Sequence, residues 1–481
     1  MGTKGRPRSK VEYGDFQTPP KLAAEICERF KSGGLKPASV FEPTCGVGAF
    51  LKASVEAFPE AQRIVGLDIN PEHLERARLQ AGKNVELVEQ NFFSLQWTSL
   101  LKSLPDPIFL PGNPPWVTSA DLGVLGSANL PAKSNFQRRS GMDALTGKSN
   151  FDVSEWILIH LADELRNRRA TMAMLCKAAV ARKLLIHCWK NHVRVSGASI
   201  RHIDALEHFE ANVGACLLTL DFGGPPATEC AVFAALSDPD PVQTIGFVDG
   251  RLVADVGTYE RVRFLENRTE GVEWRSGIKH DCARVMELTV DRAGLRNGFE
   301  EYVDIEPTYL YPLLKSSDVA HGIVNAGRYM LVPQTRVGEE TDGIQKRAPK
   351  TWTYLKRFEP LFQERSSPIY RGKPPFAIFG VGEYSFAPWK VAISGLYRAV
   401  RFAVVGPRDG RPTVLDDTCY FAPCDTEDEA VRLAELLNGR QAMEFFRSLL
   451  FLDNKRPVTV ELLRRLDVRQ LGSRLTLRPA P

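Results

Sequence analysis

A short apolar strand followed by a glycine turn constrains the fold of this chain more than any other stretch. Residues 40–50 read Val-Phe-Glu-Pro-Thr-Cys-Gly-Val-Gly-Ala-Phe, which predicts a strand, an acidic residue and a turn that opens a helix near Ala49. A second apolar strand, residues 64–67, ends in Asp68, about twenty residues beyond the turn. That spacing is typical of a parallel, doubly wound α/β sheet, in which ligands bind outside the carboxyl ends of the strands.

The residues at these two strand ends indicate a nucleoside-containing cofactor. Gly46 and Gly48 let the backbone approach a ligand closely, because a β-carbon would block it. Asp68 is then expected beside the hydroxyls of a ribose bound over the turn. The turn lacks the full dinucleotide pattern, and Glu42 would repel a pyrophosphate. A carboxylate here suits a positively charged cofactor such as S-adenosylmethionine.

Two further strand ends carry amides and aromatic rings. The apolar run 85–88 precedes Asn91 and Phe92, which suit a hydrogen bond from an adenine amine and a cover for its ring. The apolar run 108–110 precedes Gly-Asn-Pro-Pro-Trp at residues 112–116. All four strand ends are therefore predicted to meet in one crevice.

The double proline of residues 112–116 makes a stiff loop that neither continues a sheet nor begins an ordinary helix. In this loop the Asn113 side-chain oxygen and the Pro114 carbonyl can accept hydrogen bonds from one amino group. Trp116 offers a face on which a planar ring can stack. The loop therefore predicts a site for the exocyclic amine of a base. The alternative is a tight turn that ends a strand with a buried Trp.

Taken in order, these motifs resemble those of the gamma class of S-adenosylmethionine-dependent DNA adenine methyltransferases. The resemblance covers about residues 14–116 and begins with Gly14-Asp15-Phe16-Gln17-Thr18-Pro19-Pro20. By itself, Thr18 predicts the cap of a helix over residues 21–30. The sequence departs from many relatives in having Asn91 for Asp and Trp116 for Tyr or Phe. The resemblance implies a seven-stranded, mostly parallel, Rossmann-like sheet followed by an α+β target-recognition domain.

The resemblance also implies the residues of the site. Those expected to border S-adenosylmethionine are Phe16, Gln17, Thr18, Glu42, Pro43, Thr44, Gly46, Gly48, Phe50, Asp68, Ile69, Asn91 and Phe92. Those expected to hold the target adenine are Asn113, Pro114, Pro115 and Trp116, with Phe222 as a second aromatic ring. Such an enzyme flips the adenine out of duplex DNA and methylates its N6 amine. The reaction requires neither a metal nor a covalent enzyme intermediate.

The rest of the chain is expected to bind double-stranded DNA. We predict a catalytic domain over residues 1–258 and a recognition domain over 259–481. The second domain follows a complete methyl-transfer core, so its large size suggests recognition of a large, specific substrate. A polar stretch after residue 120 suggests a DNA-facing loop, and short basic segments follow in the second half. The cations expected to contact DNA are Lys133, Arg138, Arg139, Lys148, Arg275, Lys279, Lys346, Arg347 and Lys350. The alternative for any of them is a solvated surface.

Composition excludes several other classes. The formal net charge of this 481-residue chain is only +4, so any polyanion-binding surface must be local. Its nine cysteines are never spaced Cys-x-x-Cys, which argues against a structural zinc site or a disulfide framework. No stretch resembles a membrane span or a secretory signal, so we expect a cytoplasmic protein associated with the nucleoid of a bacterium or archaeon.

Three alternatives stay open from the sequence. A protein-glutamine methyltransferase would also bind a planar amine at Asn-Pro-Pro, and an RNA methyltransferase would use the same core. A non-catalytic DNA specificity module would keep the fold without the reaction. A bifunctional restriction enzyme is not expected, because only 13 residues precede Gly14 and an N-terminal nuclease would need more. A separately encoded restriction endonuclease is a possible partner by resemblance.

Overall fold

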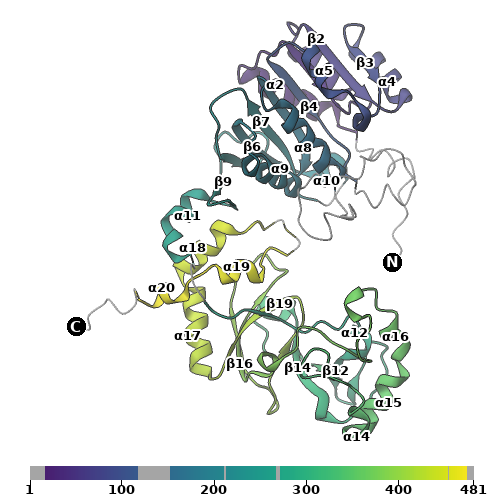
Figure 1. Cartoon of the computed structure of the whole chain (residues 1–481), viewed down its shortest axis with the longest axis vertical. Helices are drawn as coiled ribbons and strands as arrows, with labels where there is room; N and C mark the ends of the chain where they lie inside the picture. The colour runs from purple at the N-terminus through teal and green to yellow at the C-terminus, as the bar shows by residue number, and fades with distance from the viewer. Residues whose placement is uncertain are drawn as a thin grey trace, which may run out of the picture. The chain divides into compact units, whose positions relative to one another are not determined.

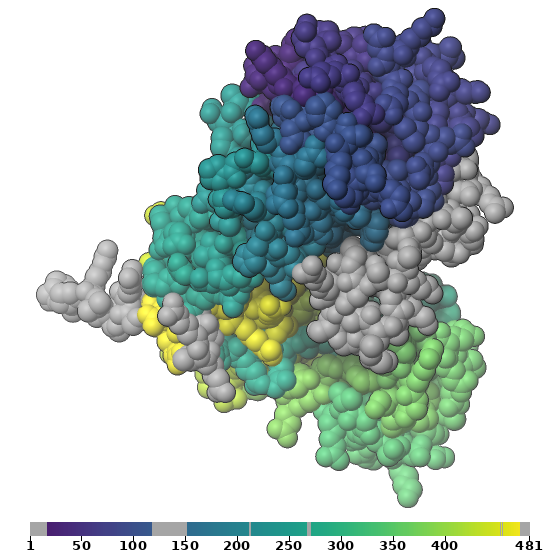
Figure 2. Space-filling model, turned by 45° about the horizontal axis from the view of Figure 1, so that its top comes forward, coloured from purple at the N-terminus to yellow at the C-terminus, as the bar shows by residue number. Residues whose placement is uncertain are grey.

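A computed structural model describes residues 17–117, 152–210, 213–266, 271–452, 454 and 456–473. The chain divides into two compact units, Met1–Val256 and Gly257–Pro481 (Figure 1). The division falls after Val256, and the boundary expected from sequence falls after residue 258. Figure 2 shows one face of the molecule as a space-filling view, coloured by residue number.

The first unit is built on a ten-stranded sheet with the strand order β10-β9-β8-β6-β7-β5-β4-β1-β2-β3. Strands β1 to β5 run parallel where they pair, and β7 runs antiparallel to both β5 and β6. Six strands lie where the sequence placed them: β1 (Ser39–Glu42), β2 (Arg63–Asp68), β3 (Glu86–Glu89), β4 (Ile108–Gly112), β5 (Ala170–Lys177) and β7 (Ala215–Phe222). With β6 (Val195–Ile203) they make the seven strands that the resemblance implies.

Three strands extend this sheet beyond the predicted seven. They are β8 (Glu229–Phe233), β9 (Gln243–Val248) and β10 (Arg251–Val253). β8 pairs parallel with β6, and β9 and β10 follow as antiparallel neighbours. The predicted doubly wound, mostly parallel α/β fold is confirmed, with a wider sheet than the sequence indicated.

Helices cover both faces of the sheet. All four residues of β1 are therefore buried, on whichever face their side chains lie. Val40 of β1 and Phe109 of β4 belong to the core formed with α2, α3 and α4. Phe41 points to the other face, where its ring meets Trp97 of α5. The helices of this unit are α2 (Pro20–Ser32), α3 (Ala49–Ala57), α4 (Pro71–Ala81), α5 (Trp97–Ser103), α8 (Val153–Leu165), α9 (Ala178–Lys190) and α10 (Ala205–Phe209).

The second unit contains two smaller sheets. The four-stranded sheet has the order β11-β19-β16-β17, and the five-stranded sheet has the order β13-β12-β15-β14-β18. Their strands are β11 (Arg275–Ser276), β12 (Glu287–Asp291), β13 (Gly294–Arg296), β14 (Leu310–Leu314), β15 (Arg328–Leu331), β16 (Trp389–Ser394), β17 (Ala403–Val405), β18 (Val414–Leu415) and β19 (Cys419–Cys424).

Short helices surround these sheets, which agrees with the predicted α+β character of the second part. They are α11 (Val256–Val262), α12 (Ala283–Met286), α13 (Ser316–His321), α14 (Ile344–Arg347), α15 (Pro349–Arg357), α16 (Glu359–Gln363), α17 (Glu427–Asn438), α18 (Arg440–Leu449), α19 (Val460–Arg464) and α20 (Val468–Ser473). In the described parts of both units, no helix is both long and apolar enough to cross a membrane.

Gly48 has a packing role that differs from the one expected. It caps α3 in the left-handed conformation, with φ 87° and ψ 26°. A β-carbon at Gly48 would lie 2.9 Å from the Cβ of Ala77, so the residue lets α3 and α4 approach each other. Contact with a ligand at Gly48 stays a prediction, and the close approach of Ala77 is a second reason for a glycine at this position.

Substituting Gly48 tests this packing role. Gly250 is a matched control, since it has φ +77° and no heavy atom within 4 Å of an added β-carbon. Gly250→Ala should destabilise the protein by about 1–2 kcal/mol through backbone strain alone. Gly48→Ala should cost about 1–3 kcal/mol more, because the helices must also separate. If denaturant unfolding shows the same loss of unfolding free energy in both variants, the contact between α3 and α4 is not the reason for a glycine at position 48.

Candidate functional site

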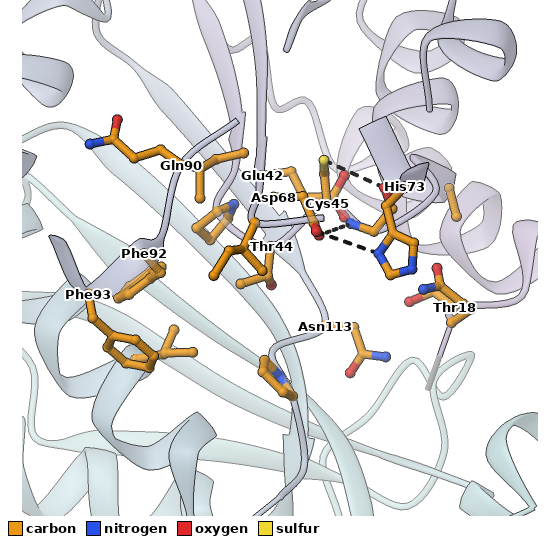
Figure 3. Close-up of a pocket in the computed structure, with 18 residues that line it drawn as sticks. Thr18, Glu42, Thr44, Cys45, Asp68, His73, Gln90, Phe92, Phe93 and Asn113 are labelled. Atoms are coloured by element: carbon orange, nitrogen blue, oxygen red, sulfur yellow. Dashed lines mark hydrogen bonds and ion pairs between the residues drawn. The ribbon is translucent and has the colours of Figure 1, made fainter. Parts of the chain in front are cut away.

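A cleft opens where the carboxyl ends of β1, β2 and β4 meet. It holds about 790 Å³ of space, including the part open to solvent. Its lining residues are Gln17, Thr18, Glu42, Pro43, Thr44, Cys45, Gly46, Ala49, Leu67, Asp68, Ile69, His73, Gln90, Phe92, Phe93, Asn113, Pro115 and Ile157. Figure 3 shows Phe92 and Phe93 toward one end of this cleft and Thr18, His73 and Asn113 toward the other.

Asp68 ties the ends of β1 and β2 together. Its Oδ2 accepts a hydrogen bond of 2.8 Å from the Gly46 N–H, and its Oδ1 accepts one of 2.8 Å from the Asn70 N–H. His73 Nδ1 lies 3.5 Å from Oδ1 (Figure 3). A carboxylate has about four acceptor positions, so Asp68 can hold the turn and still accept from a ribose hydroxyl.

Glu42 is a buried acid in the wall of the cleft, with only 3% of its surface exposed. Burial raises the pKa of Glu42 well above the usual range, and the charge of Asp68 raises it further. Among the described residues, Glu42 Oε2 and Thr44 Oγ1 are buried without a hydrogen-bond partner. Buried acceptors of this kind favour a ligand that donates N–H or O–H groups. The site therefore fits a cofactor with an amino group and hydroxyls.

The first described residues close the cleft beside the glycine turn. Gln17 Oε1 accepts a hydrogen bond of 3.2 Å from the Val47 N–H. Thr18 is 8% exposed and lines the cleft. The predicted Thr18 cap is wrong, because α2 begins at Pro20 with Pro19 as its cap residue and no side-chain cap bond. Phe16 lies outside the described residues.

An aromatic cluster backs the far end of the cleft. Phe92 is 4% exposed, and its ring centroid lies 4.5 Å from that of Trp97. Trp156 and His160 of α8 stack at 5.1 Å with an interplanar angle of 14°, and both rings also meet Phe92 edge-on. Phe93 joins Phe92 in lining the cleft. These rings offer an apolar wall for a planar group.

Two other predicted cofactor residues do not line the cleft. Asn91 Oδ1 accepts a hydrogen bond of 2.8 Å from the Phe93 N–H, so this side chain caps its own turn, as short amides often do. Phe50 is 1% exposed and packs in the core. Gln90, Cys45 and His73 line the cleft instead. The sequence motifs do not indicate these three, although each lies within five residues of a predicted site residue.

The loop after β4 is divided between the cleft and the core. Asn113 and Pro115 line the cleft, and Pro114 lies between them. Trp116 is 6% exposed, its Nε1 donates a hydrogen bond of 3.4 Å to the Leu175 carbonyl, and its ring meets that of Phe209 at 5.1 Å. This arrangement matches the alternative of a buried Trp rather than a free stacking face.

Phe222 is at the wrong edge of the sheet. It ends β7 and pairs with Ala170, the first residue of β5. Because β7 runs antiparallel to β5, its carboxyl end lies opposite the edge that carries the cleft. The ring of Phe222 is also 5% exposed. The prediction that it contacts the same base as Asn113 is therefore corrected.

The predicted DNA-contacting cations that the structure describes lie on several segments of the second unit. Arg275 forms an ion pair with Glu273 on the four-stranded sheet, and Lys279 is 2.9 Å from Asp281. Lys350 Nζ is 2.7 Å from Asp304, and the Arg347 guanidinium lies 5.8 Å from the centre of the Tyr309 ring. Lys346 is exposed and has no ion-pair partner in the described chain. Lys133, Arg138, Arg139 and Lys148 lie outside the described residues.

Comparisons with known proteins agree on one family. The type II methyltransferase M.NspV of a Nostoc species is 41% identical over 474 residues, which is 97% of this chain and 98% of the relative. The type II methyltransferase M.CvrRI of a Paramecium bursaria Chlorella virus is 31% identical over 111 residues, which is 23% of this chain and 26% of the relative. No protein-family model matches the chain.

A solved structure shares the fold. The type IIL restriction-modification enzyme MmeI, solved in complex with DNA, superposes with a TM-score of 0.54 and 13% identity. The match covers 95% of this chain and 65% of the MmeI chain. The arrangement of a methyltransferase sheet followed by a further domain is therefore found in both proteins.

Glu42→Gln tests whether the cleft contains a buried charge. Because the folded-state pKa of Glu42 is raised, the wild-type protein loses stability as pH rises from the usual Glu range through that raised value. The glutamine variant avoids this loss. We expect Glu42→Gln to stabilise the cofactor-free protein by about 1–3 kcal/mol at pH 8, and by less at pH 5, in denaturant unfolding. The exposed Glu89→Gln is the control, and an equal effect of both variants would contradict the account.

Proposed function

The chain belongs to the type II methyltransferases of restriction-modification systems, and we propose that it methylates the N6 amine of an adenine flipped out of duplex DNA. One observation carries this proposal. The Asn113 amide lines the same cleft as the carboxylates of Glu42 and Asp68, so a base amine and a charged nucleoside cofactor can be held together. Proximity of this kind supplies much of the rate in a transfer between two bound molecules.

S-adenosylmethionine is the methyl donor, and its sulfonium supplies a methyl group that is a good electrophile. Among the residues of this chain, Glu42 is proposed to accept from the amino group and Asp68 from the ribose hydroxyls. Phe92 and Phe93 are proposed to cover the adenine ring, because they form the apolar end of the cleft. The orphaned oxygen of Glu42 supports this assignment most directly.

The loop after β4 is proposed to activate the target amine. The lone pair of an adenine amine is delocalised into the ring, which makes the amine a poor nucleophile. Hydrogen bonds to the Asn113 oxygen and the Pro114 carbonyl would favour a tetrahedral nitrogen and direct its lone pair toward the methyl group. Neither group is a strong base, so the surplus proton leaves after the transfer.

Duplex DNA is the substrate that best accounts for the rest of the molecule. The amine of a paired adenine faces its partner base, so the nucleotide must be flipped at a cost of a few kcal/mol. A second unit of residues 257–481 follows the methyl-transfer core and suits recognition of a large, specific substrate. This favours DNA over the side chain of a protein glutamine. A separately encoded restriction endonuclease would share the recognition site.

Asn113→Ala tests the role of the amide. Because the variant loses an acceptor that acts on the reacting nitrogen, we expect the single-turnover rate of methyl transfer to fall by about 100-fold or more. The dissociation constant for S-adenosylmethionine, measured by calorimetry, should change by less than about threefold, which is under 1 kcal/mol. Asn191→Ala, which removes an amide from the end of α9, should leave both values unchanged. Loss of cofactor binding in Asn113→Ala, with normal turnover of the residual complex, would refute the assignment.

Lys346 and Lys350 provide a matched test of phosphate contact by the second unit. Lys350 is already neutralised by Asp304, whereas Lys346 has no such partner among the described residues. Each phosphate contact contributes about 0.9 to the slope of log affinity against log salt. Lys346→Met should therefore reduce the slope by about 0.9, and Lys350→Met should reduce it by less. If both variants keep the salt dependence of the wild type, neither lysine contacts a DNA phosphate.

A further inference from the structure

Lys177 connects the loop after β4 to its neighbouring strand. It is the last residue of β5, and its Nζ donates a hydrogen bond of 3.5 Å to the Trp116 carbonyl. The same ammonium forms an ion pair with Asp152 Oδ2. The Trp116 indole is tied to β5 as well, through the Leu175 carbonyl. Both the main chain and the side chain of Trp116 are thus anchored on one strand.

Asp152 extends this connection to the start of α8. Its Oδ1 accepts a hydrogen bond of 3.1 Å from the Ser154 N–H and caps the helix. The next residue, Val153, donates its N–H to the Val117 carbonyl at 2.8 Å. The side chain of Asp152 is 11% exposed and that of Lys177 is 26% exposed, so the ion pair is partly shielded from water and salt. We call Trp116, Asp152 and Lys177 the loop clasp.

The loop clasp fixes the far end of the segment that contains Asn113. The near end is fixed by pairing of β4 with β5, which sets Gly112 opposite Met174. Between the two fixed ends lie Asn113 and two prolines, whose rings restrict the backbone. The backbone on both sides of Asn113 is therefore held by β5.

We propose that Lys177 is a positioning residue for methyl transfer, which orients Asn113 through the loop clasp without touching the substrate. The proposal rests on the proposed function of Asn113. It also gives Trp116 an anchoring role in place of the stacking role expected from sequence. A misplacement of about 1 Å in a reacting group can lower a rate by about 100-fold, so loss of the clasp should affect the chemical step more than binding.

Four variants separate positioning from folding. Lys177→Met removes the ammonium, and Lys177→Arg keeps a charge that can reach the same acceptors. Because Lys177→Met leaves Asp152 without its partner, the double variant Lys177→Met/Asp152→Asn removes both charges while Asn keeps the helix cap. The control is Lys183→Met, which breaks a similar pair between α9 and Glu155 of α8 but does not touch the loop.

The readouts are the single-turnover transfer of labelled methyl groups to unmethylated genomic DNA, the dissociation constants for S-adenosylmethionine and DNA, and the melting temperature. We expect Lys177→Met and the double variant to lose about 10- to 100-fold in rate, with both dissociation constants within about twofold of wild type. The double variant should have a higher melting temperature than Lys177→Met, but its rate of methyl transfer should stay as low. Lys177→Arg should recover most of the rate, and Lys183→Met should keep it.

Several outcomes would overturn the proposal. A wild-type rate in the double variant would show that the clasp does not position Asn113. A loss in Lys183→Met as large as that in Lys177→Met would indicate a general effect of α8 on folding. Labelled methyl groups on a base other than adenine would refute the proposed function alone, since the rate ratios would still report on the clasp. Wild-type protein that labels no DNA would refute both.

Discussion

The hydrogen bond from the Gly46 N–H to Asp68 Oδ2 is the contact on which the site depends. It joins the turn after β1 to the end of β2 and fixes the floor of the cleft. Asn70 donates to the other oxygen of the same carboxylate and begins α4. The walls then follow from the topology, because β4 delivers Asn113 to the same edge of the parallel sheet.

The cleft is built at the expense of stability in the cofactor-free protein. Glu42 is buried beside Asp68, and Thr44 adds a second buried oxygen with no partner in the described chain. Burying an acid that has one oxygen without a hydrogen-bond partner opposes folding, and a bound donor would relieve that opposition. The residues that cost stability are therefore among those that we propose to bind S-adenosylmethionine, which is a common compromise in binding sites.

Sequence patterns predicted the parts of the site that depend on strand order. Asp68 and Asn113 reach one cleft because the carboxyl ends of parallel strands share an edge. The patterns failed where the partner of a side chain lies far away in sequence. Trp116 packs against Phe209, and Gly48 lies close to Ala77 on the next helix. β7 runs antiparallel to β5, which places Phe222 at the edge opposite the cleft.

The central claim is that this family member modifies the amine of adenine. Mass spectrometry of nucleosides from DNA of cells that express the protein, compared with cells that express Asn113→Ala, tests it most directly. The account predicts N6-methyladenine in the first DNA and its absence in the second. Methylated cytosine, or DNA without any new modified base, would contradict the claim.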